Sequence, residues 1–139
     1  MESQYILFSL NQAHYGIPIE YISEIAPYNE ITVIPKLPHN IKGVVSFRGN
    51  IIPVIDIERE FGLKDSIYDE EDSRLIVLSC NDTEFAIQVE SASESICIGD
   101  ECIQDSSNIA LGFQSEYIKG IGVKDRKLIF ILDIANLIN

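Results

Sequence analysis

The feature that most constrains this chain is an internal repeat, in which two stretches of sequence recur at fixed offsets. Residues 5–24 match the segment within residues 74–94 at an offset of 70, and residues 41–57 match residues 118–134 at an offset of 77. Polar positions recur together with the apolar ones: Lys42 with Lys119, Gly43 with Gly120, and Asp56 with Asp133. A repeat of this kind predicts two similar structural units.

We expect the two copies to occupy approximate halves, 5–63 and 74–138, of a single domain that spans residues 1–139. An acidic connector, residues 64–73, joins them, and its run of charges is most simply a solvated loop. A half of this size buries little surface alone, so the two halves should depend on each other for stability.

Apolar residues within each half occur in short runs bounded by turn residues, a spacing that predicts strands of a barrel or sandwich. The predicted strands are 5–10, 14–19, 31–34, 41–47, 51–56, 74–80, 84–89, 117–123 and 127–133. Single helical turns are predicted at 20–24, 57–61 and 134–138. The fold class is therefore mainly β, with two small barrels of about five strands each.

Charge and hydropathy narrow the range of partners. The formal net charge of −12 disfavours binding to nucleic acid or to acidic lipid. No run approaches the roughly 18 apolar residues of a membrane span, and no secretory signal is recognisable at the start. We expect a cytoplasmic protein with no direct membrane insertion.

The sequence offers few groups for catalysis, and we expect no catalytic residue, no metal and no cofactor. Asp56 and Glu58 resemble a carboxylate pair, but Asp56 recurs in the second copy and is better explained as a helix cap. A small-ligand barrel or a hydrolase that uses both carboxylates with His14 remains an alternative. Cys80 is expected to be a buried thiol. Cys97 and Cys102 form a near pair, either reduced thiols or a metal or redox site.

One turn differs between the copies. The first copy has Ser46-Phe47-Arg48-Gly49-Asn50 where the second has Val123-Lys124-Asp125-Arg126-Lys127. Gly49 suits a tight hairpin turn, with Asn50 beside it. Arg48 could then meet a carboxylate, and Glu24 is the candidate partner; alternatively, Arg48 is a simple exposed turn residue.

A second difference lies at Ile22, Glu24 and Ile25, whose counterparts in the second copy are Ala92, Glu94 and Ser95. Aliphatic side chains beside a charge are typical of a protein-binding surface. The alternative is that Ile22 and Ile25 belong to the core. Phe47 is likewise more often a core residue than a contact residue.

The chain resembles the CheW family of chemotaxis coupling proteins over nearly its whole length, from Tyr5 to Ile138. Residues 21–57 are similar to the family's succession of Ile/Val-x-Glu-Ile, Ile-x-x-Pro-x-x-Pro, Ile-x-Gly, Arg-Gly and Pro-Val-Ile-Asp. Residues 117–138 resemble the closing strands and short helix. Residues 85–90 depart from the family's Gly-Leu-x-Val-Asp.

This resemblance implies two intertwined five-stranded SH3-like barrels and a scaffold without catalytic activity. It implies binding to the cytoplasmic tip of chemoreceptors and to the regulatory domain of the histidine kinase CheA, within receptor arrays at the inner membrane. Ile22, Glu24, Ile25, Arg48 and Gly49 fall on receptor-binding positions. A coupling protein of another chemosensory pathway, governing pili or gliding, is the nearer alternative.

Overall fold

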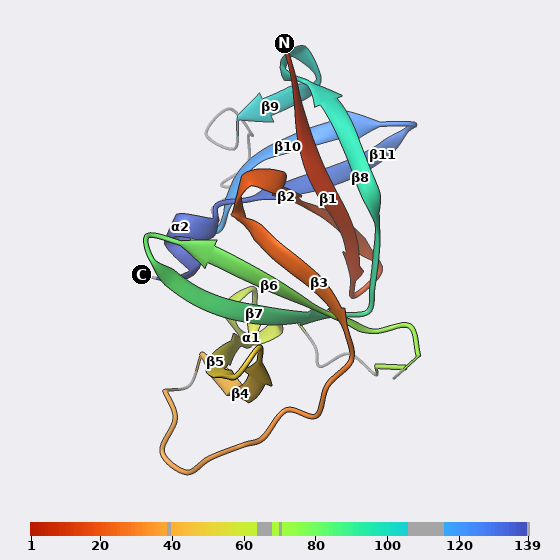
Figure 1. Cartoon of the computed structure of the whole chain (residues 1–139). Coiled ribbons are helices and arrows are strands. Elements are labelled where there is room, and N and C mark those ends of the chain that lie inside the picture. Colours follow the sequence, from red (N-terminus) through yellow and green to blue (C-terminus); the bar gives the residue numbers. More distant parts are fainter. Residues whose placement is uncertain (39, 64–67, 70, 106–115, 139) are drawn as a thin grey trace. The chain divides into compact units, whose positions relative to one another are not determined.

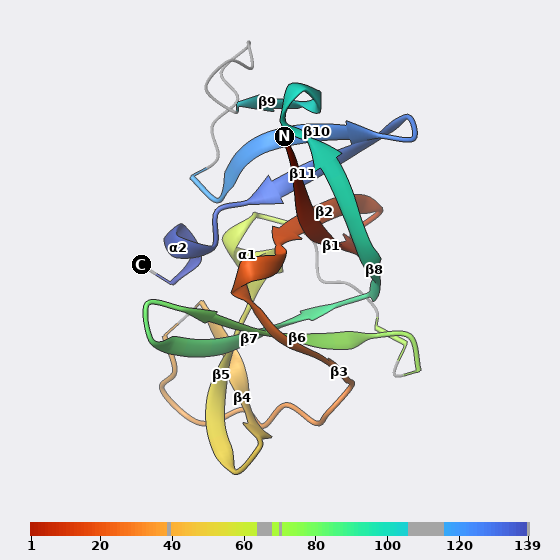
Figure 2. The same cartoon turned by 45° about the horizontal axis from the view of Figure 1, so that its top comes forward.

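The computed structural model describes residues 1–38, 40–63, 68–69, 71–105 and 116–138. The fold is mainly β, as predicted, and the chain divides into two compact units (Figures 1 and 2). Unit 1 combines Met1–Tyr21 with Ala92–Asn139, and unit 2 is the continuous segment Ile22–Ser91. Unit 2 is thus inserted into unit 1. No helix in the described ranges is long and apolar enough to cross a membrane.

Unit 1 is built on a six-stranded sheet with the order β8-β1-β2-β11-β10-β9. Its strands are β1 (Glu2–Leu10), β2 (Ala13–Pro18), β8 (Ser91–Gly99), β9 (Ile103–Asp105), β10 (Ile118–Lys124) and β11 (Lys127–Leu132). A short 3-10 helix, η2 (Asp100–Cys102), separates β8 from β9. This interruption gives the sheet one strand more than the sequence predicted for each barrel.

Unit 2 is built on a five-stranded sheet with the order β3-β6-β7-β5-β4. Its strands are β3 (Ile22–Pro27), β4 (Ile41–Phe47), β5 (Asn50–Ile55), β6 (Arg74–Cys80) and β7 (Thr83–Val89). The segment predicted as a strand over 31–34 forms only an isolated bridge, between Thr32 and Val44. Pro35 and Pro38 follow it closely, and proline cannot extend a ladder.

The two units do not coincide with the two halves of the repeat, because the halves exchange hairpins. Strand β5 of the first half runs parallel to β7 of the second, with Val54 opposite Ala86. Strand β11 of the second half runs parallel to β2 of the first, with Phe130 opposite Tyr15. Each sheet therefore contains strands from both halves, which is how the two copies intertwine.

Each unit has its own apolar cluster. The cluster of unit 1 contains Tyr5, Ile98, Ile129 and Ile131, with Leu7, Ile96 and Ile103 packed against it. The cluster of unit 2 contains Val45, Ile52, Val54, Leu75, Val77 and Ala86, with Ala26, Ile31 and Phe47 packed against it. Burial of such side chains is the main favourable term in folding.

A glycine in the equivalent strand of each unit allows another segment to approach closely. A Cβ added at Gly43 would lie 2.5 Å from Ile31 Cγ2 and 2.6 Å from the Thr32 carbonyl oxygen. At Gly120 a Cβ would lie 3.0 Å from Ile103 Cγ2. The repeated Lys-Gly pair thus preserves a packing requirement, since only glycine leaves room for the neighbouring backbone.

One short helix follows the last strand of each copy, as predicted. These helices are α1 (Ile57–Glu60) in the first copy and α2 (Ile134–Leu137) in the second. The helical turn predicted over 20–24 is wrong. A 3-10 helix, η1 (Ile19–Tyr21), ends before that segment does, and β3 begins at Ile22. Pairing with the distant strand β6 overrides the local pattern there.

Candidate functional site

The turn at Arg48 stands out when the hairpins are compared. In the described part of the chain, four two-residue turns have positive φ at both positions: Asn11-Gln12, Arg48-Gly49, Asn81-Asp82 and Asp125-Arg126. Turns of this kind favour Asn, Asp or Gly, because these residues tolerate the left-handed region best. Three of the four turns begin with Asn or Asp. Arg48, at φ 52°, is the exception, so the turn geometry does not explain its presence.

Arg48 makes the contact that the sequence predicted. Its guanidinium Nη2 donates a hydrogen bond to Oε1 of Glu24, and the two side chains form an ion pair. The Arg48 side chain is 71% exposed and that of Glu24 is 35% exposed. The guanidinium carbon also lies 5.1 Å from the centroid of the Phe47 ring. In the strand order of the five-stranded sheet, β3 and β4 are the two outermost strands. The ion pair therefore connects β3 to the turn that joins β4 to β5.

Ile22, Glu24 and Ile25 all lie on β3, opposite Leu78, Val77 and Ile76 of β6. The register shifts between Ile22 and Glu24, where Ser23 is the extra residue. A bulge of this kind redirects the side chains that flank it. All three predicted residues are partly buried, so each is accessible while also packing on its own unit.

Gly49, Asn50 and Phe47 complete the turn. Gly49 has φ 81°, and no atom lies within 4 Å of where its Cβ would be, so backbone conformation rather than space requires glycine there. Asn50 is exposed and pairs with Phe47 across the hairpin end. Phe47 packs partly buried against the apolar cluster of unit 2, in the core position favoured by the sequence.

Both carboxylates of the hydrolase alternative have structural partners. The Asp56 side chain accepts a hydrogen bond from the Arg59 amide at 3.2 Å and caps α1, as predicted from the repeat. Asp133 caps α2 in the same way, through the Asn136 amide at 3.2 Å. Glu58 is only 3% exposed and accepts a hydrogen bond from the Tyr68 phenol. The third residue, His14, lies on β2 of unit 1.

The sequence analysis did not predict a polar cluster around Tyr68, which lies at the middle of the connector. The phenol donates to Glu58 and contacts the Gln88 carbonyl oxygen at 3.4 Å. Lys42 Nζ donates to Gln88 Oε1 at 2.9 Å and lies 4.6 Å from the centroid of the Tyr68 ring. Tyr68 is therefore anchored on unit 2, in contrast to the solvated loop that the charge of the connector suggested. The one sequence feature that could have indicated this cluster is the presence of a tyrosine within the acidic connector.

Burial raises the pKa of Tyr68 well above its ordinary value, and the hydrogen bond to Glu58 and the negative charge of that carboxylate raise it further. Asp56 and Glu90 act in the same direction. The phenol consequently stays protonated and remains a donor at neutral pH. In unit 1, burial also raises the pKa of Tyr5 and of Tyr15.

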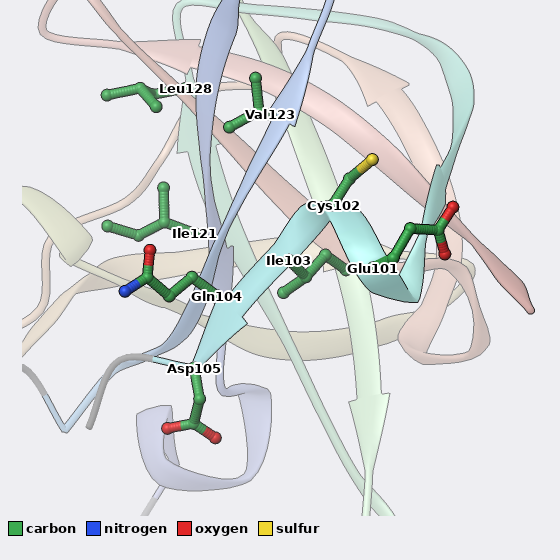
Figure 3. Close-up of a pocket in the computed structure, with 8 residues that line it drawn as sticks. All are labelled: Glu101, Cys102, Ile103, Gln104, Asp105, Ile121, Val123 and Leu128. Carbon is green, nitrogen blue, oxygen red and sulfur yellow. The ribbon is translucent and has the colours of Figure 1, made fainter. Parts of the chain in front are cut away.

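A groove of about 850 Å³ lies on unit 1, and no sequence pattern predicted it. It is lined by Glu101, Cys102, Ile103, Gln104, Asp105, Ile121, Val123 and Leu128 (Figure 3). Val123 and Leu128 face each other across the β10–β11 hairpin and are 48% and 57% exposed. Cys102 is an exposed free thiol, Cys97 is partly buried, and Cys80 is buried as predicted.

The fold and the site together define a small β protein of the scaffold class, which carries accessible charged and apolar side chains on unit 2. The family model described as "CheW-like domain" matches residues 4–139. The chain therefore belongs to the CheW family, which confirms the resemblance seen in its sequence.

Individual relatives agree with this assignment. The chain is 31% identical to "Chemotaxis protein CheW" of Klebsiella aerogenes over 98% of this chain and 81% of that protein. It is 27% identical to the CheW of Treponema pallidum over 96% of this chain and 81% of that protein. The crystal structure of the scaffolding protein TtCheW from Thermoanaerobacter tengcongensis superposes with a TM-score of 0.85 at 30% identity, covering 96% of this chain and 90% of that one.

A further relative matches a shorter region of the chain. "Chemotaxis protein CheA" of Bacillus subtilis is 31% identical over 62% of this chain, a stretch that amounts to 12% of that protein. That larger chemotaxis protein thus carries a region similar to this chain. Taken with the CheW relatives, this similarity identifies the function as that of an adaptor in chemotaxis.

Proposed function

We propose that this chain couples the cytoplasmic tip of chemoreceptors to the regulatory domain of the histidine kinase CheA, without catalysing a reaction itself. It would act in the cytoplasm, within receptor arrays at the inner membrane. The observation that carries the proposal is the accessible Glu24–Arg48 pair, with Ile22 and Ile25 on the same strand as Glu24.

Energetics support a binding role for this pair. An ion pair as exposed as this one contributes at most about 1 kcal/mol to folding. Arg48 also occupies a backbone conformation that arginine disfavours, whereas the equivalent positions of the other hairpins hold Asn or Asp. Neither folding nor turn formation accounts for this arginine, so recognition of a partner is the better explanation.

The proposed mechanism is mechanical. Ile22 and Ile25 supply apolar contact for a receptor helix, and the Glu24–Arg48 pair fixes its register. Each charge holds the other in place before binding, which lowers the cost of ordering two long side chains in the complex. Coupling then requires only that the two signalling states of the receptor differ in affinity for the scaffold.

Substitutions at Arg48 test the receptor site. Arg48→Asn restores the residue preferred in the turn, so thermal melting should stay near the wild-type value while capture of a receptor cytoplasmic fragment is lost. Arg48→Glu should also fold normally and lose capture, because it places a like charge beside Glu24. Arg59→Gln, at another exposed arginine of unit 2, is the control. Normal capture by both Arg48 variants would refute the assignment.

Ile22→Lys tests the apolar part of the site. A charged side chain on β3 should weaken receptor capture, since it would be desolvated in the complex. Ile51→Lys is the matched control, because Ile51 lies on β5 of the same unit and is 74% exposed. Equal capture by the wild type and both variants would remove Ile22 from the site.

A further inference from the structure

The segment that follows β3 lies along β4. Thr32 and Val44 form a bridge in which each backbone amide donates to the carbonyl oxygen of the other residue, both at 2.9 Å. Closer to β3, the side chain of Asn29 donates through Nδ2 to the Ser46 carbonyl oxygen at 3.3 Å. Later residues of the segment therefore meet earlier residues of β4. The segment runs antiparallel to β4, and its β3 end lies beside the β4–β5 turn.

Asparagine suits this contact because both ends of its amide are used. Asn29 Oδ1 accepts a hydrogen bond from the Glu30 amide at 2.9 Å, while Nδ2 donates to Ser46. One partner can only donate and the other can only accept, so a side chain with one donor group and one acceptor satisfies both. Aspartate would keep the bond to Glu30 but would place an acceptor against the Ser46 carbonyl oxygen. The two bonds together fix the direction of this exposed side chain.

The hydrogen bond from Asn29 to Ser46, here called the Asn29 tether, ends two residues before Arg48. The Arg48 guanidinium in turn reaches Glu24 on β3, so the tether and the ion pair join the same two stretches of chain. The tether holds the backbone of β4 at Ser46, and the Arg48 side chain extends from the turn that follows directly. The distance between that turn and Glu24 therefore depends on Asn29.

In unit 1 the equivalent segments are joined by a longer backbone ladder. Ile121 is the repeat counterpart of Val44, and β9 pairs with β10 there over three consecutive residues. Unit 2 has an isolated bridge at this place, and the Asn29 tether lies on the side of the bridge that is nearer to Arg48. The tether thus supports the one of these two hairpins whose turn carries an arginine paired with a carboxylate.

We infer that Asn29 is a positioning residue of the receptor site, which holds the β4–β5 turn at the distance from β3 that the Glu24–Arg48 pair requires. This inference rests on the proposed function, and it adds a residue to the site proposed there. An exposed neutral hydrogen bond contributes little to folding, because water offers the same partners to both groups. In receptor binding, the tether lowers the cost of ordering the arginine, because the turn is already in place.

The test measures the affinity of the full chain for a receptor cytoplasmic fragment, together with thermal melting. Asn29→Ala should weaken the affinity about fivefold, the factor expected for one net hydrogen bond, and leave melting near the wild-type value. Asn29→Asp should weaken the affinity further, because its carboxylate repels the Ser46 carbonyl oxygen. Asn81→Asp is the control, since it adds the same charge at an exposed turn of the same unit and should bind normally.

A Glu24→Ala background separates positioning from a general effect on structure. Without the carboxylate there is no ion pair to position, so Asn29→Ala should cause no further loss of affinity in that background. An equal loss in the presence and in the absence of Glu24 would mean that the tether acts independently of the pair, and it would overturn the inference. A lowered melting temperature in both Asn29 variants would overturn it as well.

Other results separate the inference from the proposed function. If the wild-type chain and both Asn29 variants bind the receptor fragment equally well, the inference is wrong and the receptor site stands. If the wild-type chain does not bind the fragment, both fall together. Binding to the purified CheA homologue of the same organism should be unchanged in both Asn29 variants. Its loss would show a general disturbance of the fold and would overturn the inference.

Discussion

The β4–β5 and β10–β11 hairpins share one sequence pattern and one backbone conformation, yet they end differently. Both contain a lysine at a register shift followed by a closely approached glycine, and both lead into a capped helix. At its tip, β4–β5 presents an arginine neutralised by Glu24, whereas β10–β11 presents cations that face each other. The repeat therefore preserves the residues that make the hairpin, whereas the residues at its solvent-exposed end differ between the two copies.

The close approach of Gly43 and Gly120 gives the largest expected difference between the two hairpins. Gly43→Ala should lower the free energy of unfolding by about 2 kcal/mol or more, because the added methyl group meets the Thr32 carbonyl oxygen at 2.6 Å. Gly120→Ala, whose nearest contact is 3.0 Å, should cost about 1 kcal/mol. Urea denaturation of the two variants measures both values. Equal losses of stability would contradict the expectation that the looser contact at Gly120 accommodates a methyl group better than the contact at Gly43 does.

The Tyr68 cluster has no counterpart at the repeated position of unit 1, where Ala135 replaces Glu58. Tyr68→Phe should lower the free energy of unfolding by about 1–2 kcal/mol at neutral pH, since the buried carboxylate of Glu58 loses a donor. Urea titrations of the wild type and the variant at neutral pH measure this difference.

The pH dependence of the same variant follows from the raised pKa of Tyr68. The unfolded phenol ionises near pH 10 while the folded one keeps its proton, so stability is intact below that pH and falls as the pH rises above it. Tyr68→Phe should make this alkaline decline shallower, with Tyr5 and Tyr15 accounting for what remains. An unchanged decline would show that Tyr68 is not the dominant alkaline group.

The helix caps are where the two copies should behave alike. Asp56→Ala and Asp133→Ala should each lower the free energy of unfolding by about 1 kcal/mol, because each carboxylate accepts an amide hydrogen bond of the same length. Asp→Asn at either site should retain most of that stability. A large loss on Asp56→Asn alone would point to a role for the charge of Asp56 beyond capping.

The smallest expected effect has the opposite sign. Lys124→Gln should raise the free energy of unfolding by about 0.5 kcal/mol, because it relieves repulsion from Lys127. Arg48→Gln should lower it by no more than about 1 kcal/mol, since it removes an exposed ion pair. Thermal melts at low and high salt compare the two. A loss of stability for Lys124→Gln would mean that the charge pair is compensated within the fold.

Local patterns predicted the regular elements well where each strand pairs with its sequence neighbour. β4 and β6 have the predicted bounds, and the Glu24–Arg48 contact followed from the difference between the copies. Prediction failed at β3 and β8, whose strand character comes from partners far along the chain, and at β9, which has only three residues. The receptor-binding role of Ile22, Glu24, Ile25, Arg48 and Gly49 stays a prediction.

Other features depend on tertiary structure in ways that a pattern does not record. The Tyr68 cluster joins a connector residue to side chains from α1, β4 and β7, and no spacing rule links those positions. The groove of unit 1 depends on β9, a strand of three residues that carries too little pattern to be recognised. The parallel contacts of β5 with β7 and of β11 with β2 likewise appear only when the two halves are folded together.

The insertion of unit 2 within unit 1 has a consequence for synthesis on the ribosome. All strands of the five-stranded sheet have been made once residue 89 is translated, so that sheet can assemble early. The β1–β2 hairpin must wait for β11, its parallel neighbour, which is translated after all the other described strands. Until then the amide and carbonyl groups along one edge of β2 are unpaired, and unpaired strand edges promote aggregation. A nascent chain stalled before residue 127 should therefore bind chaperones through β1 and β2.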